Sequence, residues 1–180
     1  MIKIKLLLIA WLQIIVFQSN GQDKQSSDYK YKAVFIYNFT KYINWPANYK
    51  TGNFVVGVLG GGQFLPVLNE MLGTKMVGSQ KIEVKVFAAA KDVGRCHILI
   101  VSDQKTNDQA IQLLRGAIEK IGTNSTLLIT EDEGLIRSGA AISFLKKGDK
   151  ITFEMNKSAV VKNKLQLSVG LERLAANVIE

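Results

Sequence analysis

The chain has 180 residues, of which 47% are hydrophobic, and a formal net charge of +8 at pH 7. This length and composition indicate a single domain with one well-buried core. The lysines are scattered and form no basic run interleaved with aromatic residues, which argues against nucleic-acid binding and favours a solvated charged surface. The chain contains one cysteine and one histidine. It therefore has no intramolecular disulfide, and its sequence indicates neither a zinc site nor a catalytic triad.

The N-terminus has the pattern of a secretory signal peptide. Lys3 and Lys5 precede an apolar run from Leu6 to Phe17, after which small and polar residues lead to Gly21. The run is short for a transmembrane helix and is interrupted by Gln13. We therefore predict that the first 21 residues are a signal peptide cleaved near Gly21 and that the mature protein is exported in soluble form. An uncleaved membrane anchor is the alternative.

The stretch from Tyr31 to Pro46 predicts a helix with two apolar sides. Residues 22–28 before it are polar, and we expect them to be a flexible lead-in to a domain spanning residues 29–180. Three good N-cap residues lie just before the helix, Ser26, Ser27 and Asp28, and Pro46 ends it. One side carries Ala33, Ile36, Phe39, Tyr42 and Ile43, and the other carries Val34, Tyr37 and Trp45. Such a helix must be covered on both sides, either by the rest of the domain or, alternatively, by a second chain.

Three strands and a short helix are predicted between residues 54 and 101. Phe54–Leu59 and His97–Val101 are apolar on both faces, as expected of central parallel strands. Phe64–Leu72 has helical spacing, with Pro66 in its first turn and Gly73 after its end. Lys81–Phe87 alternates and is expected nearer an edge of the sheet, with Ile82, Val84 and Val86 facing inward.

The strongest helix signal follows the third strand. Thr106 and Gln109 form a capping box, and Gly122 is the stop. Residues with helical spacing lie between them: Ala110, Ile111, Leu114, Ala117, Ile118 and Ile121. Because Thr126–Thr130 is a second buried strand, residues 97–130 predict a right-handed βαβ unit.

The C-terminal third predicts an antiparallel hairpin and a final helix. Ala141–Lys146 and Ile151–Asn156 alternate across the turn KKGDK, with core-facing residues Ile142, Phe144, Ile151, Phe153 and Met155. Asn156 can cap a short helical turn, and Ser168 can start a last helix that carries Leu171, Leu174, Ala175 and Val178. The predicted fold is a single-domain α/β sandwich. Its mixed sheet is parallel in the centre and antiparallel at the C-terminal hairpin, with helices on both faces.

Polar and glycine residues follow the parallel strands at their carboxyl ends, where open α/β sheets bind ligands. This candidate ligand crevice comprises Gly60, Gly61, Gly62, Ser102, Asp103, Thr130, Glu131 and Asp132. The glycines match no dinucleotide or P-loop fingerprint, so a tight strand-to-helix turn is the simpler interpretation. Polar residues at strand ends are routinely turn and cap residues, and a hydrolase using Asp103 or Asp132 is the least favoured hypothesis. We assign no catalytic residue, metal site or cofactor.

Five motifs together resemble one protein family. They occur in the order KAVFIYNFTKYINWP, VVGVLG, RCHILIVS, LLITEDEGLIRSGAAISF and ITFEMNKSAVVKNKLQLSVGLERLA. In this order they resemble the YfiR family of bacterial periplasmic proteins, from about Tyr29 to Val178. The resemblance implies a homodimeric regulator that binds and represses the outer domain of an inner-membrane signalling protein, typically a diguanylate cyclase. It also implies a role in biofilm or exopolysaccharide control.

The resemblance and the residues together predict a protein–protein contact surface. The candidate partner-binding residues are Tyr37, Trp45, Phe153, Met155, Asn156, Leu165, Ser168, Leu171 and Leu174. Other family members carry further cysteines with redox roles, whereas this chain has only Cys96. Cys96 opens an apolar run and is expected to be a buried, inert thiol, with an intermolecular disulfide as the alternative. A histidine kinase is an alternative partner, and a small-ligand-binding module using the crevice is the alternative function.

Overall fold

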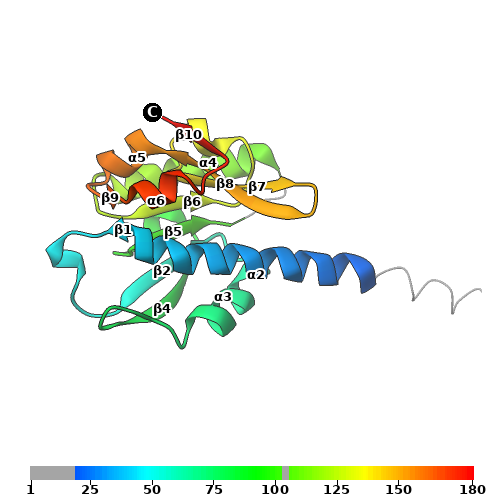
Figure 1. Ribbon diagram of the computed structural model, residues 1–180, viewed down its shortest axis with the longest axis horizontal. Coiled ribbons are helices and arrows are strands. Elements are labelled where there is room, and N and C mark those ends of the chain that lie inside the picture. The colour runs from blue at the N-terminus through cyan, green and yellow to red at the C-terminus, as the bar shows by residue number, and fades with distance from the viewer. Residues whose placement is uncertain (1–18, 103–105) are drawn as a thin grey trace, which may run out of the picture.

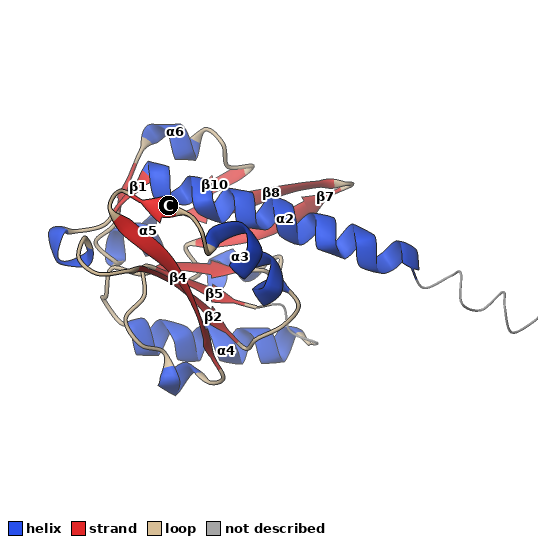
Figure 2. Ribbon diagram, turned by 90° about the horizontal axis from the view of Figure 1, so that it is seen from below, coloured by secondary structure: helices blue, strands red, loops and turns tan. Residues whose placement is uncertain are grey.

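The structure, a computed structural model, describes residues 19–102 and 106–180 (Figure 1). An eight-stranded mixed sheet with the strand order β10-β8-β7-β6-β5-β2-β4-β3 forms its centre. The helices α2 and α3 lie on one face of this sheet and α4 lies on the other, which confirms the predicted fold class (Figure 2). In the described part of the chain, no helix is long and apolar enough to cross a membrane.

Helix α2 spans Ser19–Tyr42 and begins earlier than the sequence predicts. The residues expected to form a flexible lead-in are helical, and the proposed N-cap residues lie inside the helix. Tertiary contacts explain the difference. The Tyr29 ring stacks on Phe64 with centroids 5.0 Å apart, and Asp28 forms an ion pair with Lys146 of the C-terminal hairpin. The first 18 residues, which hold most of the predicted signal peptide, lie outside the described residues.

The end of α2 leads into a small second sheet. Strand β1 (Ile43–Asn44) pairs antiparallel with β9 (Gln166–Leu167), and Ser168 N donates a hydrogen bond of 2.9 Å to the Tyr42 carbonyl. A 3₁₀ turn, η1 (Ala47–Tyr49), follows. The chain therefore leaves α2 before Pro46, because residues 43–44 pair with the C-terminal region.

Strands β2 (Phe54–Leu59), β5 (Ile98–Val101) and β6 (Leu127–Thr130) form the parallel centre of the sheet. All three are almost completely buried, as predicted. Helix α3 (Phe64–Leu72) has the predicted bounds. The 3₁₀ turn η2 (Ala90–Asp92) precedes β5 in the chain.

Strand β4 (Gln80–Phe87) lies second from the edge of the sheet, beside the two-residue strand β3 (Met76–Val77). The prediction that Val86 faces the core is wrong, since its side chain is 48% exposed. Strand β3 pairs only with residues 80 and 81, so the remainder of β4 has no described strand on its outer side. Val86 lies in this unprotected half.

The predicted βαβ unit is confirmed, with β5 and β6 parallel and α4 (Asn107–Ile121) between them in sequence. Thr106 Oγ1 accepts a hydrogen bond of 3.3 Å from Gln109 N, as an N-cap does. Gly122 ends the helix with φ +53°, a conformation that favours glycine. Helix α4 packs its buried stripe on the face of the sheet opposite to α2.

The C-terminal hairpin consists of β7 (Ile142–Lys147) and β8 (Lys150–Asn156), which are antiparallel as predicted, after the 3₁₀ turn η3 (Leu135–Ser138). Four of its five predicted core residues are buried, whereas Ile151 is only half-buried. The hairpin projects beside the N-terminal half of α2 (Figure 1).

The prediction of a long final helix is wrong. After α5 (Lys157–Lys162), the helix α6 spans only Val169–Glu172, and Asn177–Ile179 form strand β10. Strand β10 pairs in parallel with β8 and supplies the last strand of the sheet. Val178 therefore belongs to a strand, because the open edge of β8 offers backbone partners that a local helical pattern cannot report.

Candidate functional site

The predicted ligand crevice contains a buried ion pair. Lys32 of α2 reaches across the end of the sheet, and its Nζ lies 2.9 Å from Oε1 of Glu131. The other oxygen of this carboxylate, Oε2, accepts a hydrogen bond of 3.1 Å from Ser102 Oγ. The side chain of Glu131 is 0% exposed and that of Lys32 is 12% exposed. A cation and a hydroxyl of the chain itself thus hold the carboxylate.

The glycine turn at this edge packs closely against the same group of residues. Gly60, Gly61 and Gly62 all have positive φ, as the sharp turn from β2 to α3 requires. A Cβ built on Gly62 would lie 2.9 Å from Ser102 Oγ, so a larger residue would push into the hydroxyl that binds Glu131. Gly60 N donates to the Phe87 carbonyl at 3.0 Å. The turn therefore fits the strand-to-helix interpretation.

The remaining crevice residues make local hydrogen bonds. Thr130 Oγ1 accepts from Asp132 N at 3.2 Å, and Ser143 Oγ donates to the Asp132 carbonyl at 2.9 Å. Asp103 lies outside the described residues. Within residues 19–102 and 106–180, no group of three or more histidine, cysteine, aspartate or glutamate side chains could hold a metal ion. Among the described residues at this end of the strands, the charged groups Lys32 and Glu131 form an ion pair within the chain.

Most predicted partner-binding residues lie in the core. Those buried there are Trp45, Phe153, Met155, Leu165 and Leu171. Asn156 and Ser168 cap α5 and α6 by accepting hydrogen bonds from Ala159 N and Gly170 N. Leu174, at 52%, and Ser168 are exposed, and Tyr37 is half-buried. Burial makes the five core residues unavailable as direct contacts in this fold.

Helix α2 carries an apolar surface that the sequence prediction only half recognised. We define the outer face of α2 as Lys30, Tyr31, Val34 and Lys41, all of which are exposed. Tyr31 is 56% exposed and Val34 is 46% exposed, one helical turn apart. The sequence prediction of a second apolar side on this helix includes Val34 but not Tyr31.

Cys96 and His97 are both buried just before β5. The predicted burial of Cys96 is confirmed, and desolvation raises the pKa of its thiol to about 12, which favours an unreactive thiol. Val55 N donates to His97 Nδ1 at 3.1 Å, and His97 Nε2 lies 2.7 Å from the Tyr49 carbonyl. Only a neutral ring with its proton on Nε2 satisfies both contacts. Burial, and to a smaller extent the charge of Arg95, lowers the pKa of His97, against the opposing effect of the Tyr49 hydrogen bond.

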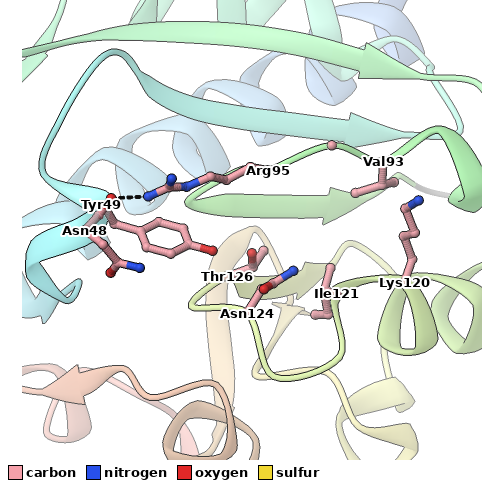
Figure 3. A pocket seen from close by; sticks show the side chains of 9 residues that line it. Asn48, Tyr49, Val93, Arg95, Lys120, Ile121, Asn124 and Thr126 are labelled. Carbon is pink, nitrogen blue, oxygen red and sulfur yellow. Dashed lines mark hydrogen bonds between the residues drawn. The ribbon is translucent and has the colours of Figure 1, made fainter.

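A polar pocket of about 260 Å³ lies at the opposite end of the parallel strands (Figure 3). The loops that precede β2, β5 and β6 and the end of α4 form its walls. Its lining includes the cations Arg95 and Lys120. The sequence prediction missed this pocket because its residues come from three distant loops and match no motif.

Together these features define a single-domain α/β protein with a buried ion pair at the carboxyl ends of its parallel strands. The comparison with curated proteins gave no match. A family model described as YfiR/HmsC-like matches residues 29–176, and the chain therefore belongs to this family. The family consists of periplasmic proteins that are regulatory rather than catalytic.

Proposed function

We propose that the chain is exported, with cleavage near Gly21, and binds the extracytoplasmic domain of an inner-membrane signalling protein in the periplasm. The partner is a diguanylate cyclase or a histidine kinase, and binding represses it and thereby lowers biofilm or exopolysaccharide output. Membership in the YfiR/HmsC-like family supports this function. In the crevice, Lys32 and Ser102 already bind the Glu131 carboxylate, which favours this function over the alternative of a small-ligand module at the carboxyl ends of the strands.

The observation that carries the proposal is the outer face of α2. A protein contact needs apolar and aromatic anchors that are exposed in the free protein, with polar residues around them. Tyr31 and Val34 provide such anchors, and Lys30 and Lys41 flank them. The helix crosses the front of the molecule in Figure 1.

Tyr37 extends this surface toward β3. Its hydroxyl donates a hydrogen bond of 3.4 Å to the Met76 carbonyl, and Lys41 Nζ lies 4.8 Å from the centre of its ring. Met76 is itself 48% exposed. These contacts hold the Tyr37 ring in place. A partner that covers Tyr31 and Val34 can therefore also contact Tyr37. Among the predicted partner-binding residues, this fold leaves Leu174 and Ser168 exposed and Tyr37 half-buried.

The test uses Tyr31→Ser and Val34→Ser, with Val161→Ser on α5 as a matched control because Val161 is also strongly exposed. The wild-type protein serves as bait in detergent-solubilised membranes of its host, and the membrane protein that it captures is identified by mass spectrometry. We expect one that combines a transmembrane helix, an extracytoplasmic domain and a cytoplasmic cyclase or kinase domain.

Calorimetry with the purified extracytoplasmic domain then measures affinity. Each outer-face substitution should raise the Kd about tenfold or more, as removal of an interface anchor does, and should raise cyclase or kinase output in cells. Val161→Ser should change neither. Outer-face variants that bind and repress like the wild type would refute the proposed surface, and the absence of any such membrane partner would refute the function.

Homodimer formation is a second part of the proposal. Light scattering measures the mass of the wild type and of Tyr31→Ser in solution. A dimer that survives this substitution uses another surface and leaves the outer face of α2 to the partner. A dimer that dissociates with Tyr31→Ser assigns this face to the second copy, which would contradict its role as the partner surface. A monomeric wild type would refute the dimer.

A further inference from the structure

The pocket at the amino ends of β2, β5 and β6 concentrates positive charge without an acidic counterpart. Its lining residues are Asn48, Tyr49, Val93, Gly94, Arg95, Lys120, Ile121, Asn124 and Thr126. Two of them are cations and none is acidic. Its volume of about 260 Å³ lies just below the range of about 300–1,000 Å³ that drug-sized ligands occupy. A small organic molecule fits this size.

Arg95 is held over the pocket by two contacts. Its guanidinium carbon lies 4.1 Å from the centre of the Tyr49 ring, and its Nη2 donates a hydrogen bond to the Asn48 carbonyl. A guanidinium has five N–H donors, so this single hydrogen bond leaves most of them for another acceptor. Figure 3 shows Arg95 above the Tyr49 ring, with Lys120 at the far side of the pocket. Both cations therefore line the same pocket.

Further donors line the same space. The Tyr49 hydroxyl points into the pocket toward Thr126 in Figure 3, and among the described residues none forms a hydrogen bond with it. The side-chain amides of Asn48 and Asn124 also line the pocket. Thr126 differs, because its hydroxyl donates to the Cys96 carbonyl at 2.8 Å. The available groups are mainly donors, which suits an acceptor-rich ligand.

The end of α4 is the one feature that opposes an anion here, because helix C-termini carry partial negative charge. Two of the terminal carbonyls are already paired within the chain. Gly122 N donates to Ile118 O at 3.0 Å, and Asn124 N donates to Ile121 O at 2.9 Å. Two full positive charges outweigh what remains of a partial negative charge of about half a unit.

We propose that this pocket binds a small organic dianion, a dicarboxylate or a phosphate monoester, between Arg95 and Lys120. In a dicarboxylate, one carboxylate accepts from Arg95 and the Tyr49 hydroxyl and the other pairs with Lys120. A phosphate monoester offers its single dianionic group to Arg95, with Lys120 as the second cation of the pocket. The site lies at the amino ends of the parallel strands, whereas the buried Lys32–Glu131 pair lies at their carboxyl ends. It is also separate from the outer face of α2. It does not depend on the proposed function, because it concerns the purified protein alone.

The first test is a nuclear magnetic resonance titration of the wild-type protein with succinate and with glycerol 3-phosphate at low ionic strength. Succinamide, the neutral analogue of succinate, is the ligand control. Succinate or glycerol 3-phosphate should shift the backbone amides of Gly94, Arg95 and Asn124, and succinamide should not. Added salt should weaken binding because it screens the charges. Equal shifts with succinamide, shifts confined to other parts of the fold, or no shifts with either dianion would overturn the proposal.

The second test uses Arg95→Gln, Lys120→Gln and Tyr49→Phe, with Lys147→Gln at the exposed hairpin turn as the charge control. Calorimetry should show the Kd rising about tenfold or more for each charge variant, the loss expected for one charge-assisted hydrogen bond, and less for Tyr49→Phe. Lys147→Gln should leave the Kd unchanged. Circular dichroism verifies that each variant is folded. Equal affinity of the folded charge variants and the wild type would overturn the assignment.

Discussion

The buried ion pair between Lys32 and Glu131 makes a quantitative prediction about stability. At an Nζ–Oε1 distance of 2.9 Å and an effective dielectric constant of about 20, the two charges attract by about 6 kcal/mol. Desolvation offsets much of this gain, whereas removing one partner leaves the other charge buried without compensation. The perturbation is therefore Lys32→Met, which keeps the long apolar stem and removes the ammonium group.

We expect Lys32→Met to lower the free energy of unfolding by about 3 kcal/mol, the low end of the range for breaking a buried pair. The low end applies because Ser102 Oγ still donates to the carboxylate. Glu131→Gln should cost about 2 kcal/mol, since the 12% exposed Lys32 side chain can turn to water. The double variant should cost about 3 kcal/mol instead of the additive 5, a coupling of about 2 kcal/mol.

Urea unfolding followed by circular dichroism measures all four proteins of this double-mutant cycle. Lys157→Met is the control, because its pair with Glu172 at 3.6 Å is solvent-exposed and should contribute little to stability. Lys32→Met also removes the contacts of Lys32 Nζ with the Tyr29 and Phe144 rings. This loss occurs with either residue at position 131, so it cancels in the coupling energy. If the losses of unfolding free energy in the two single variants sum to the loss in the double variant within about 0.3 kcal/mol, the reasoning is refuted.

Three further predictions follow from other buried groups. Because burial lowers the pKa of His97, the unfolded state binds a proton at higher pH than the folded state, and stability should fall as the pH drops below 6.5. The single imidazole should titrate below pH 6.5 by nuclear magnetic resonance, and a normal titration would contradict its burial. Because the pKa of Cys96 is raised to about 12, its contribution to stability should be lost as the pH rises above 9. Its thiol should react with a disulfide reagent at pH 8 only after unfolding, and rapid reaction in the native state would show that it is accessible. Phe153→Ala should lower the free energy of unfolding by about 3–5 kcal/mol in urea, and a loss below about 1 kcal/mol would show that the site is not tightly packed.

The local elements could be predicted because each has a signal within a few residues. Strand β2 and helix α3 have the predicted bounds: β2 is an apolar run that ends at Gly60, and α3 has helical spacing and Pro66 in its first turn. The capping pattern at Thr106 likewise located the start of α4. The order of these elements was enough to indicate the parallel centre, since a strand–helix–strand segment in one sheet has few alternatives.

At the carboxyl ends of the parallel strands, the sequence predicted which residues lie there but not that they form an ion pair. The sequence placed Ser102, Thr130 and Glu131 at neighbouring strand ends, where the structure brings Ser102 and Glu131 into contact. It gave no sign that Lys32, 99 residues before Glu131, would neutralise the carboxylate. The same limit applies to the partner-binding residues, because an apolar residue of the core and an apolar residue of a docking surface look alike in sequence.

The sequence by itself determined the α/β class, the parallel centre, the C-terminal hairpin and the family, because alternation, capping and glycine signals act over short distances. Only the tertiary structure decided where α2 begins, that Val178 lies in a strand, and that Arg95 and Lys120 share a pocket. Each of these depends on pairing between segments far apart in the chain. The free energy of such contacts is realised only when the fold brings both segments together, so no local pattern reports it.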